Sequence, residues 1–264
     1  MGSISDAVTS ARFSVDTARF VASVKQLQAA SGKEANVILR EQAKLLVRDA
    51  AKMTPPFGDA PVTESWAAQR KIGQNAVRGD LQRMFVSPNQ VEERFSSKDP
   101  RFGQRLKKAL QSGDIVTANI MLERARMNAE AAIEPTAGLH RSQRDSKGHV
   151  RKRPRQFFIG NRAALAEYIA NRLRFVGLAK SGWAAAASAL GLTLPGWITG
   201  LGGSGGIREE TGEKASITVW NAVPYIQKTG ADLRIMQRAV NNRLRNFPKQ
   251  VEKTVAALAR KANR

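Results

Sequence analysis

The sequence predicts an α+β fold that is dominated by helix. Apolar residues recur three or four positions apart over much of its 264 residues, whereas two short stretches have the character of strands. The hydrophobic fraction of 42% is sufficient for a core, and the charged fraction of 25% argues against global disorder. No cysteine is present, which excludes disulfides, thiolate metal sites and thiol nucleophiles.

The N-terminal third is predicted to form an arm followed by three helices. The arm covers residues 1–15, and apolar spacing then places helices at about Asp16–Ser31, Glu34–Met53 and Glu64–Phe85. Thr54-Pro55-Pro56 stops the second helix because proline cannot continue it, and Phe57–Val62 is expected to be a loop. Gly73 and Gly79 are candidate breaks in the third helix.

The middle of the chain is predicted to contain a polar connector, two short helices and a long loop. The connector is bracketed by Pro88 and the Asp99-Pro100 step. The two helices are expected at about Phe102–Gln111 and Asp114–Ala132, the second with Asp114 as its N-cap. Glu134–Arg155 has no apolar period and is expected to be a loop or disordered.

The C-terminal part is predicted to contain both strands and the longest helix. The strands are expected at Gln156–Ile159 and Ala215–Trp220. Helices are expected at Arg162–Phe175, capped by Asn161, at Leu178–Leu190, and at about Leu233–Lys261. The Gly-rich stretch Gly196–Gly206 has the composition of a mobile loop, and Asn221–Tyr225 is expected to turn the chain.

The chain is strongly basic, with 43 Lys and Arg against 22 Asp and Glu and a net charge of +21. Much of the excess lies in Arg141–Arg155 and in Lys228–Arg264. Such a field predicts a partner that carries negative charge: a phosphate backbone, an anionic membrane or an acidic protein surface. The candidate nucleic-acid-facing residues are Arg141, Arg144, Lys147, Arg151, Lys152, Arg153 and Arg155. The alternative for Arg141–Arg155 is an ordinary solvated loop. For the basic C-terminal helix, a solvated helix face is an interpretation as well supported as a binding surface.

No stretch of the sequence predicts catalysis or a cofactor. The neighbours Glu92-Glu93 and Glu209-Glu210 point apart in a helix or strand, so neither pair forms a facing dyad. His140 and His149 lack the short spacing of metal ligands and are expected to be solvated loop residues. Gly200–Gly206 has the letters of a phosphate cradle or nucleophile elbow without the flanking strand and helix.

A membrane location is not expected. The 27-residue run Ser181–Ile207 has no charge, but it contains eight glycines and Pro195 and is too weakly apolar to insert. The first residues have no apolar core of a signal peptide, and Asp6 stands where a myristoylation pattern needs Ser or Thr. The sequence therefore predicts a soluble, cytosolic protein.

Three stretches resemble the neck and tail-completion proteins of tailed bacteriophages, which join head and tail. The first is a helix closing in Ala51–Pro56, similar to that family's Ala-Lys-x-x-Pro. The second is Lys71–Leu81, which resembles a G-x-x-A-V-x-x-D-[IL] run of phage structural proteins. The third combines Lys180–Trp183 with Trp220–Ile226, where the family has an Asn-x-x-x-Tyr-Ala element before its closing helix. Together they cover about half of the chain.

The resemblance implies a small β-sheet flanked by helices, with one long helix near each end of the sequence. It implies one domain over residues 16–264, with insertions at about 86–155, which include the basic loop 134–155, and at 191–214, the Gly-rich loop. The chain is roughly twice the usual length of the family, and Tyr225-Ile226 departs from its Tyr-Ala.

The resemblance also implies a non-enzymatic virion subunit, assembled in the host cytoplasm. Its partners are expected to be copies of itself in a ring of six or twelve, other neck, connector and tail proteins, and passing DNA in non-specific contact. The alternative is a free cytosolic protein that binds nucleic acid without sequence preference, since few aromatic residues accompany the basic segments. Tight, steeply salt-dependent binding by the monomer would favour this alternative.

Overall fold

The chain forms two compact units, and its fold is α+β and mainly helical, as predicted. The computed structural model describes residues 18–31, 35–96, 99–146, 149–210, 216–224, 226 and 231–262. Unit 1 joins Met1–Gln69 to Gly177–Arg264, and unit 2 is the intervening Arg70–Val176. The predicted arm, residues 1–15, lies outside the described residues.

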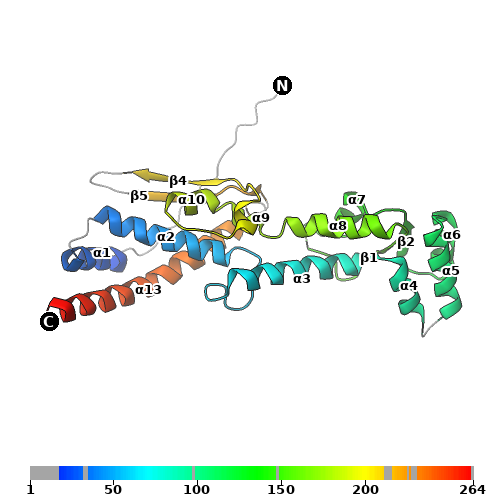
Figure 1. Cartoon of the computed structure of the whole chain (residues 1–264), viewed down its shortest axis with the longest axis horizontal. Coiled ribbons are helices and arrows are strands. Elements are labelled where there is room, and N and C mark those ends of the chain that lie inside the picture. The colour runs from blue at the N-terminus through cyan, green and yellow to red at the C-terminus, as the bar shows by residue number, and fades with distance from the viewer. Residues whose placement is uncertain are drawn as a thin grey trace, which may run out of the picture. The chain divides into compact units, whose positions relative to one another are not determined.

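Unit 1 is built on helices from both ends of the sequence. Helices α1 (Ala18–Ser31) and α2 (Ala35–Met53) pack against α13 (Ala231–Ala262), which runs beside them in Figure 1. The apolar spacing that predicts these helices supplies their contacts: Leu27, Ile38, Phe247 and Val251 form one buried cluster. Helix α13 continues through Pro248.

A buried carboxylate also ties α2 to α13. Asp49 is fully buried on α2, and its Oδ2 lies 2.7 Å from Nε of Arg243 and accepts a hydrogen bond from the side-chain amide of Asn242. A buried charge is tolerated only when it is paired and hydrogen-bonded. This pair therefore fixes which face of α13 meets α2.

The Gly-rich stretch packs tightly against the rest of unit 1, so the prediction of a mobile loop is wrong. It contains the short helix α11 (Gly196–Thr199) and enters β4 (Gly205–Glu210), which pairs antiparallel with β5 (Ser216–Asn221). A Cβ added to Gly205 would lie 1.8 Å from the carbonyl oxygen of Gly182. Here glycine permits close packing of two backbones, a role that composition alone does not distinguish from mobility.

The predicted helix Leu178–Leu190 is divided in two. Helices α9 (Leu178–Ser181) and α10 (Ala184–Ala189) are separated at Gly182 and Trp183. A Cβ at Gly182 would collide with the side chain of Asn221, the last residue of β5. The break therefore lets the end of β5 approach the backbone.

Unit 2 surrounds a three-stranded parallel sheet with the order β1-β3-β2. The strands are β1 (Phe85–Val86), β2 (Ala129–Ala132) and β3 (Gln156–Ile159), and β3 pairs Phe157 with Phe85 and Phe158 with Ala131. Every residue of β1 and three of the four in β3 are buried, as expected for a central parallel sheet. Helices α3 (Trp66–Met84) and α8 (Arg162–Arg174) connect unit 2 to the rest of the chain.

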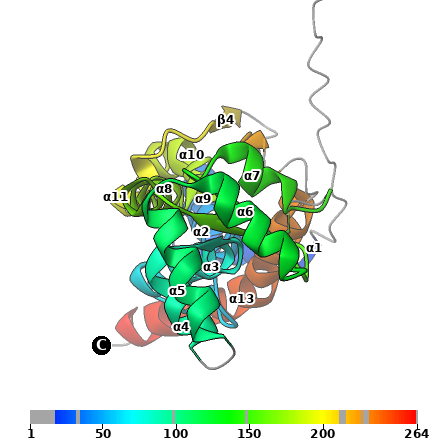
Figure 2. The same cartoon turned by 90° about the vertical axis from the view of Figure 1, so that its right-hand side faces the viewer.

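Helices α4, α5 and α6 lie side by side along one part of unit 2 (Figure 2). Their bounds are Pro88–Phe95, Pro100–Gln111 and Ile115–Arg124. Helix α4 occupies the predicted polar connector, which is a correction: Pro88 begins this helix at its first turn, where proline is favoured. Helix α3 is likewise unbroken at Gly73 and Gly79.

The predicted helix Asp114–Ala132 is wrong in its second half. Helix α6 ends at Arg124 because Arg126 takes a left-handed conformation with φ of 52° and the chain then enters β2. Such a helix end is usually marked by glycine, and no glycine marks it here. The N-caps were predicted correctly: Asp114 accepts a hydrogen bond from the amide of Thr117, and Asn161 from that of Ala164.

Candidate nucleic-acid interface

The six predicted basic residues that the structure describes do not form one solvated loop. Residues Arg141 and Ser142 end a short helix that sequence analysis missed, α7 (Ala137–Ser142), and Arg144 pairs with Val150 as an isolated bridge. Arg141, Arg151, Lys152 and Arg153 are exposed, whereas Lys147 lies outside the described residues.

Arg144 is held within unit 2 and is not free to contact a partner. Its guanidinium lies 2.9 Å from Nε2 of His140 and 3.8 Å from a carboxylate oxygen of Asp80. The Nδ1 atom of His140 lies 3.0 Å from the hydroxyl of Tyr168, and its ring packs edge-on against Phe85. His140 is therefore a half-buried residue of an aromatic cluster, which corrects the prediction of a solvated loop histidine.

The surroundings of His140 favour a neutral ring. Burial, then the positive charges of Arg144 and Arg172, lower the pKa of His140 to about 4. Since Nε2 faces a guanidinium, it must act as an acceptor, and Nδ1 then carries the proton toward Tyr168. This arrangement orients Arg144 without adding a charge.

Unit 2 is expected to lose stability as the pH falls from about 6.5 toward 4. In this window the unfolded chain binds a proton at His140 that the folded chain does not, so the free energy of unfolding decreases with falling pH. Chemical denaturation at several pH values will measure this slope. In His140→Gln, which keeps a donor and an acceptor but cannot titrate, the slope should be smaller; an equal slope would contradict the assignment.

Arg155 is neutralised by a carboxylate. Its guanidinium lies 2.9 Å from Glu130 on β2, and its backbone amide donates to the side chain of Gln143. Glu130 and Arg155 line a hollow of about 470 Å³ together with a second acidic residue, Glu123. This hollow offers no excess of positive charge, so Arg155 is poorly placed to bind phosphate.

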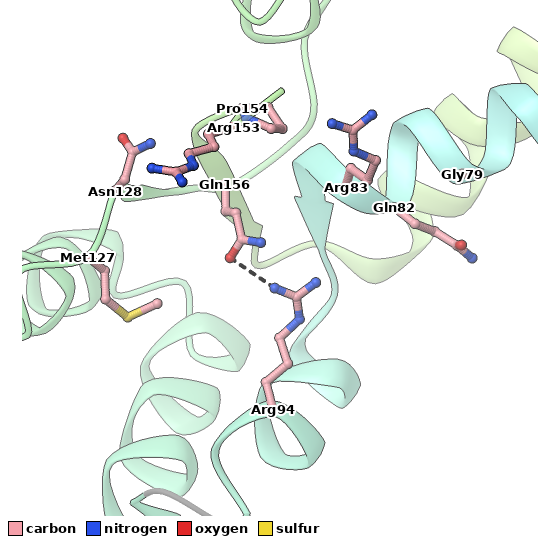
Figure 3. A pocket seen from close by; sticks show the side chains of 9 residues that line it. All are labelled: Gly79, Gln82, Arg83, Arg94, Met127, Asn128, Arg153, Pro154 and Gln156. Carbon is pink, nitrogen blue, oxygen red and sulfur yellow. Dashed lines mark hydrogen bonds between the residues drawn. The ribbon is translucent and has the colours of Figure 1, made fainter. Parts of the chain in front are cut away.

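A groove of about 530 Å³ on unit 2 has a different character. It is lined by Gly79, Gln82, Arg83, Arg94, Met127, Asn128, Arg153, Pro154 and Gln156. Figure 3 shows three arginines around it, and each belongs to a different segment: α3, α4 and the chain before β3. Its lining residues include side-chain amides and no carboxylate.

Two of these arginines are oriented by hydrogen bonds that leave their charge unpaired. Nη2 of Arg83 donates to the carbonyls of Arg151 and Lys152, at 3.0 and 3.1 Å. Nη1 of Arg94 donates to Oε1 of Gln156 at 2.9 Å, the bond drawn in Figure 3. Because all three acceptors are uncharged, both guanidinium groups keep their full charge and further N–H groups for a ligand.

Of the six predicted residues that the structure describes, only Arg153 lines this groove, and sequence analysis missed Arg83 and Arg94. Both stand in the last turn of a helix, where cations are common because they balance the helix dipole. Their sequence positions therefore carried no functional signal. Unit 2 as a whole has 22 Lys and Arg against 10 Asp and Glu, so its field reinforces the groove.

Comparisons with known proteins give this site no precedent. No family model matches the chain. The searches of curated proteins and of solved structures likewise returned no match.

In the described part of the chain, no group of three or more His, Asp or Glu residues is arranged to hold a metal ion. No helix within the described ranges has the length and apolar character of a membrane span.

A second unusual charge lies in unit 1, where Lys180 is fully buried. Its ammonium donates to the carbonyls of Ala51 and Lys52, at 2.8 and 3.2 Å, and to that of Thr54. It also lies 5.7 Å from the ring centre of Trp66. These contacts occupy all three N–H groups at the C-terminal end of α2, where the helix dipole favours a cation.

The surroundings of Lys180 shift its pKa in opposite directions. Burial and the neighbouring Lys52 lower the pKa of Lys180 to about 7, while Glu64 acts in the opposite direction. A lysine with a lowered pKa can serve as a nucleophile or base, but this one is enclosed and fully hydrogen-bonded. Its role in this structure is to cap α2.

Proposed function

We propose that the protein is a non-enzymatic structural subunit of a tailed-phage virion. It forms a ring of six or twelve copies at the neck or tail terminus, where it joins or completes the tail around the DNA channel. Its partners are other neck, connector and tail proteins. The proposal combines the resemblance of three stretches with the architecture of unit 1.

The architecture of unit 1 is the observation that carries this proposal. The resemblance implies a small sheet flanked by helices, with a long helix near each end of the sequence. Unit 1 has a two-stranded sheet, β4-β5, together with α2 and α13 from opposite ends of the chain. Unit 2 lies between these parts in the sequence and contains the second resembling stretch, Lys71–Leu81, as well as the expected insertion at about 86–155.

The resembling stretches of unit 1 also meet in space. Trp183 donates from its indole to the hydroxyl of Thr54 at 2.8 Å, and Lys180 caps the same helix end. Asn221 donates to the carbonyl of Ala179 at 2.8 Å. Stretches that are far apart in sequence thus form one packed junction, which supports their origin in a common fold.

A free nucleic-acid-binding protein is the second candidate function. The arginine groove of unit 2 favours it, because phosphate binding there does not require a ring. The two candidates differ in assembly: the virion subunit has to oligomerise, whereas the free factor acts as a monomer.

The assembly state of the purified chain will test the proposal. We expect rings of six or twelve copies in negative-stain images and in mass photometry, alone or with the portal and tail-tube proteins of the same genome. Ring closure buries the same surfaces in every copy, so one discrete mass is expected rather than a distribution. The protein should also be detected in purified virions.

A strict monomer that is absent from virions would overturn the proposal. If that monomer also binds duplex DNA tightly and with a steep salt dependence, the second candidate is correct. If the chain forms rings but the isolated monomer binds DNA weakly, the virion subunit is supported, because many copies together then supply the field.

A further inference from the structure

We infer that the groove between α3, α4 and β3 is a binding site for the phosphodiester backbone of duplex DNA. This inference rests on the proposed function in one respect: there, the duplex is the genome that passes through the ring. Arg83, Arg94 and Arg153 contact the phosphates, and the amides of Gln82 and Asn128 add uncharged donors. Of the predicted basic segment Arg141–Arg155, this site includes Arg153, and the other two arginines come from α3 and α4.

The state of the charges in the groove supports an anionic ligand. Arg83 and Arg94 are held by neutral acceptors, and no carboxylate lines the groove. Two other arginines of unit 2 lie beside carboxylates: Arg155 pairs with Glu130, and Arg144 lies near Asp80. An anion in the groove would therefore meet three guanidinium groups and would not have to displace a carboxylate of the lining.

The chemistry of the lining favours a phosphate backbone over nucleobases. Guanidinium groups bind phosphate oxygens through paired N–H groups, and amide side chains commonly donate to the same oxygens. Single-stranded DNA is usually held by aromatic side chains that stack on bases. Among the described residues that line the groove none is aromatic, and Met127 is the large apolar side chain.

Gly79 leaves the α3 side of the groove open. A Cβ added at this position would have no atom within 4 Å, so the helix backbone itself faces the groove. A larger residue can therefore be introduced there without disturbing the fold. Glutamate is also a better helix former than glycine by roughly 0.5 kcal/mol or more.

The test measures duplex binding by fluorescence anisotropy across a series of salt concentrations, with the full chain in its native assembly state. Gly79→Glu should fold normally and bind at least about 10-fold more weakly, because it places a carboxylate among the three arginines. Its control, Gln104→Glu, adds the same charge at an exposed position of α5 and should change affinity about 3-fold at most.

A second pair of variants removes positive charge instead. The double variant Arg94→Gln and Arg153→Gln should reduce the slope of log affinity against log salt by about one for each phosphate that is no longer neutralised. The control double variant removes Arg101 and Arg105, two exposed cations of α5 that do not line the groove. Arg83 is left in place because it also holds two backbone carbonyls.

If the groove variants and their controls lose the same DNA affinity, the inference is overturned, because only the total charge of the protein would then determine binding. Tighter binding to polyglutamate than to duplex at the same salt would also overturn it and assign the groove to an acidic protein. Competition by inorganic phosphate as effective as that by duplex, per phosphate, would show a site for free ions. If the protein forms rings but its groove variants bind DNA as their controls do, this inference is refuted and the virion function is not. If the protein is a monomer and the groove variants bind DNA more weakly than their controls, only the virion function is refuted.

Discussion

Lys180→Met is expected to lower the free energy of unfolding of unit 1 by about 2–4 kcal/mol, because it leaves buried carbonyls without a donor. The ammonium is the described partner of the Ala51 and Thr54 carbonyls, whereas Lys52 also receives a bond from Gln69. Methionine fills a similar volume, so the missing hydrogen bonds rather than a cavity dominate the effect. Chemical denaturation followed by tryptophan fluorescence will measure it.

The matched control for this variant is Lys25→Met, at an exposed position of α1. It should change stability by no more than about 0.5 kcal/mol. Similar decreases in both variants would show that Lys180 does not cap α2 in solution.

The pH dependence separates Lys180 from a simple packing defect. The lowered pKa means that the unfolded chain holds a proton on Lys180 between about pH 7 and its ordinary 10.5, where the folded chain releases it. The free energy of unfolding of the natural chain should therefore rise with pH in this window, by up to about 1.4 kcal/mol per pH unit. In Lys180→Met this rise should be absent; an identical rise in both proteins would contradict the assignment.

Gly205→Ala is expected to be the most destabilising single-methyl change in the Gly-rich stretch. The new Cβ would lie 1.8 Å from the carbonyl oxygen of Gly182 and 2.7 Å from that of Trp220. Both are backbone atoms, so β4 has to move away from α9 and α10. Overpacking of this kind costs about 1–3 kcal/mol where neighbours can shift, and we expect at least the upper end here. Hydrogen exchange should show faster exchange of the β4 and β5 amides.

Gly196→Ala is the control within the same stretch. A Cβ at Gly196 meets no atom within 4 Å, so this change should be neutral or stabilise α11 by up to about 1 kcal/mol. If both substitutions are tolerated equally, the stretch is a mobile loop after all, as its composition suggested.

The helices and caps of this fold were predictable because local signals determine them. Thr54-Pro55-Pro56 ends α2, and Asp114 and Asn161 cap the helices that follow them. The misassigned elements depend on tertiary contacts. Strand β2 has the composition of a helix, Ala-Glu-Ala-Ala, and is extended because it pairs with β3 in the sheet.

The positive charge of the candidate site was predictable from the sequence, but the residues that form the site were not. The density of cations in Arg141–Arg155 pointed to the correct part of the chain, since Arg153 lies in the groove. It could not show that His140 and Glu130 engage two members of the set. Nor could it show that Arg83 and Arg94, from helices more than 50 residues earlier, belong to the site, because the parallel pairing of β1 with β3 is a tertiary contact that brings these segments together.

The division of unit 1 between two distant segments has a consequence for biosynthesis. Helix α2 is synthesised before unit 2, whereas α13, which packs against it, is synthesised after unit 2. Unit 2 is complete well before then, and domains generally fold as units during synthesis. The apolar faces of α1 and α2 thus remain uncovered while the intervening chain is translated. We expect the nascent protein to need a chaperone or a neighbouring subunit during this interval, and unit 2 to acquire its structure first.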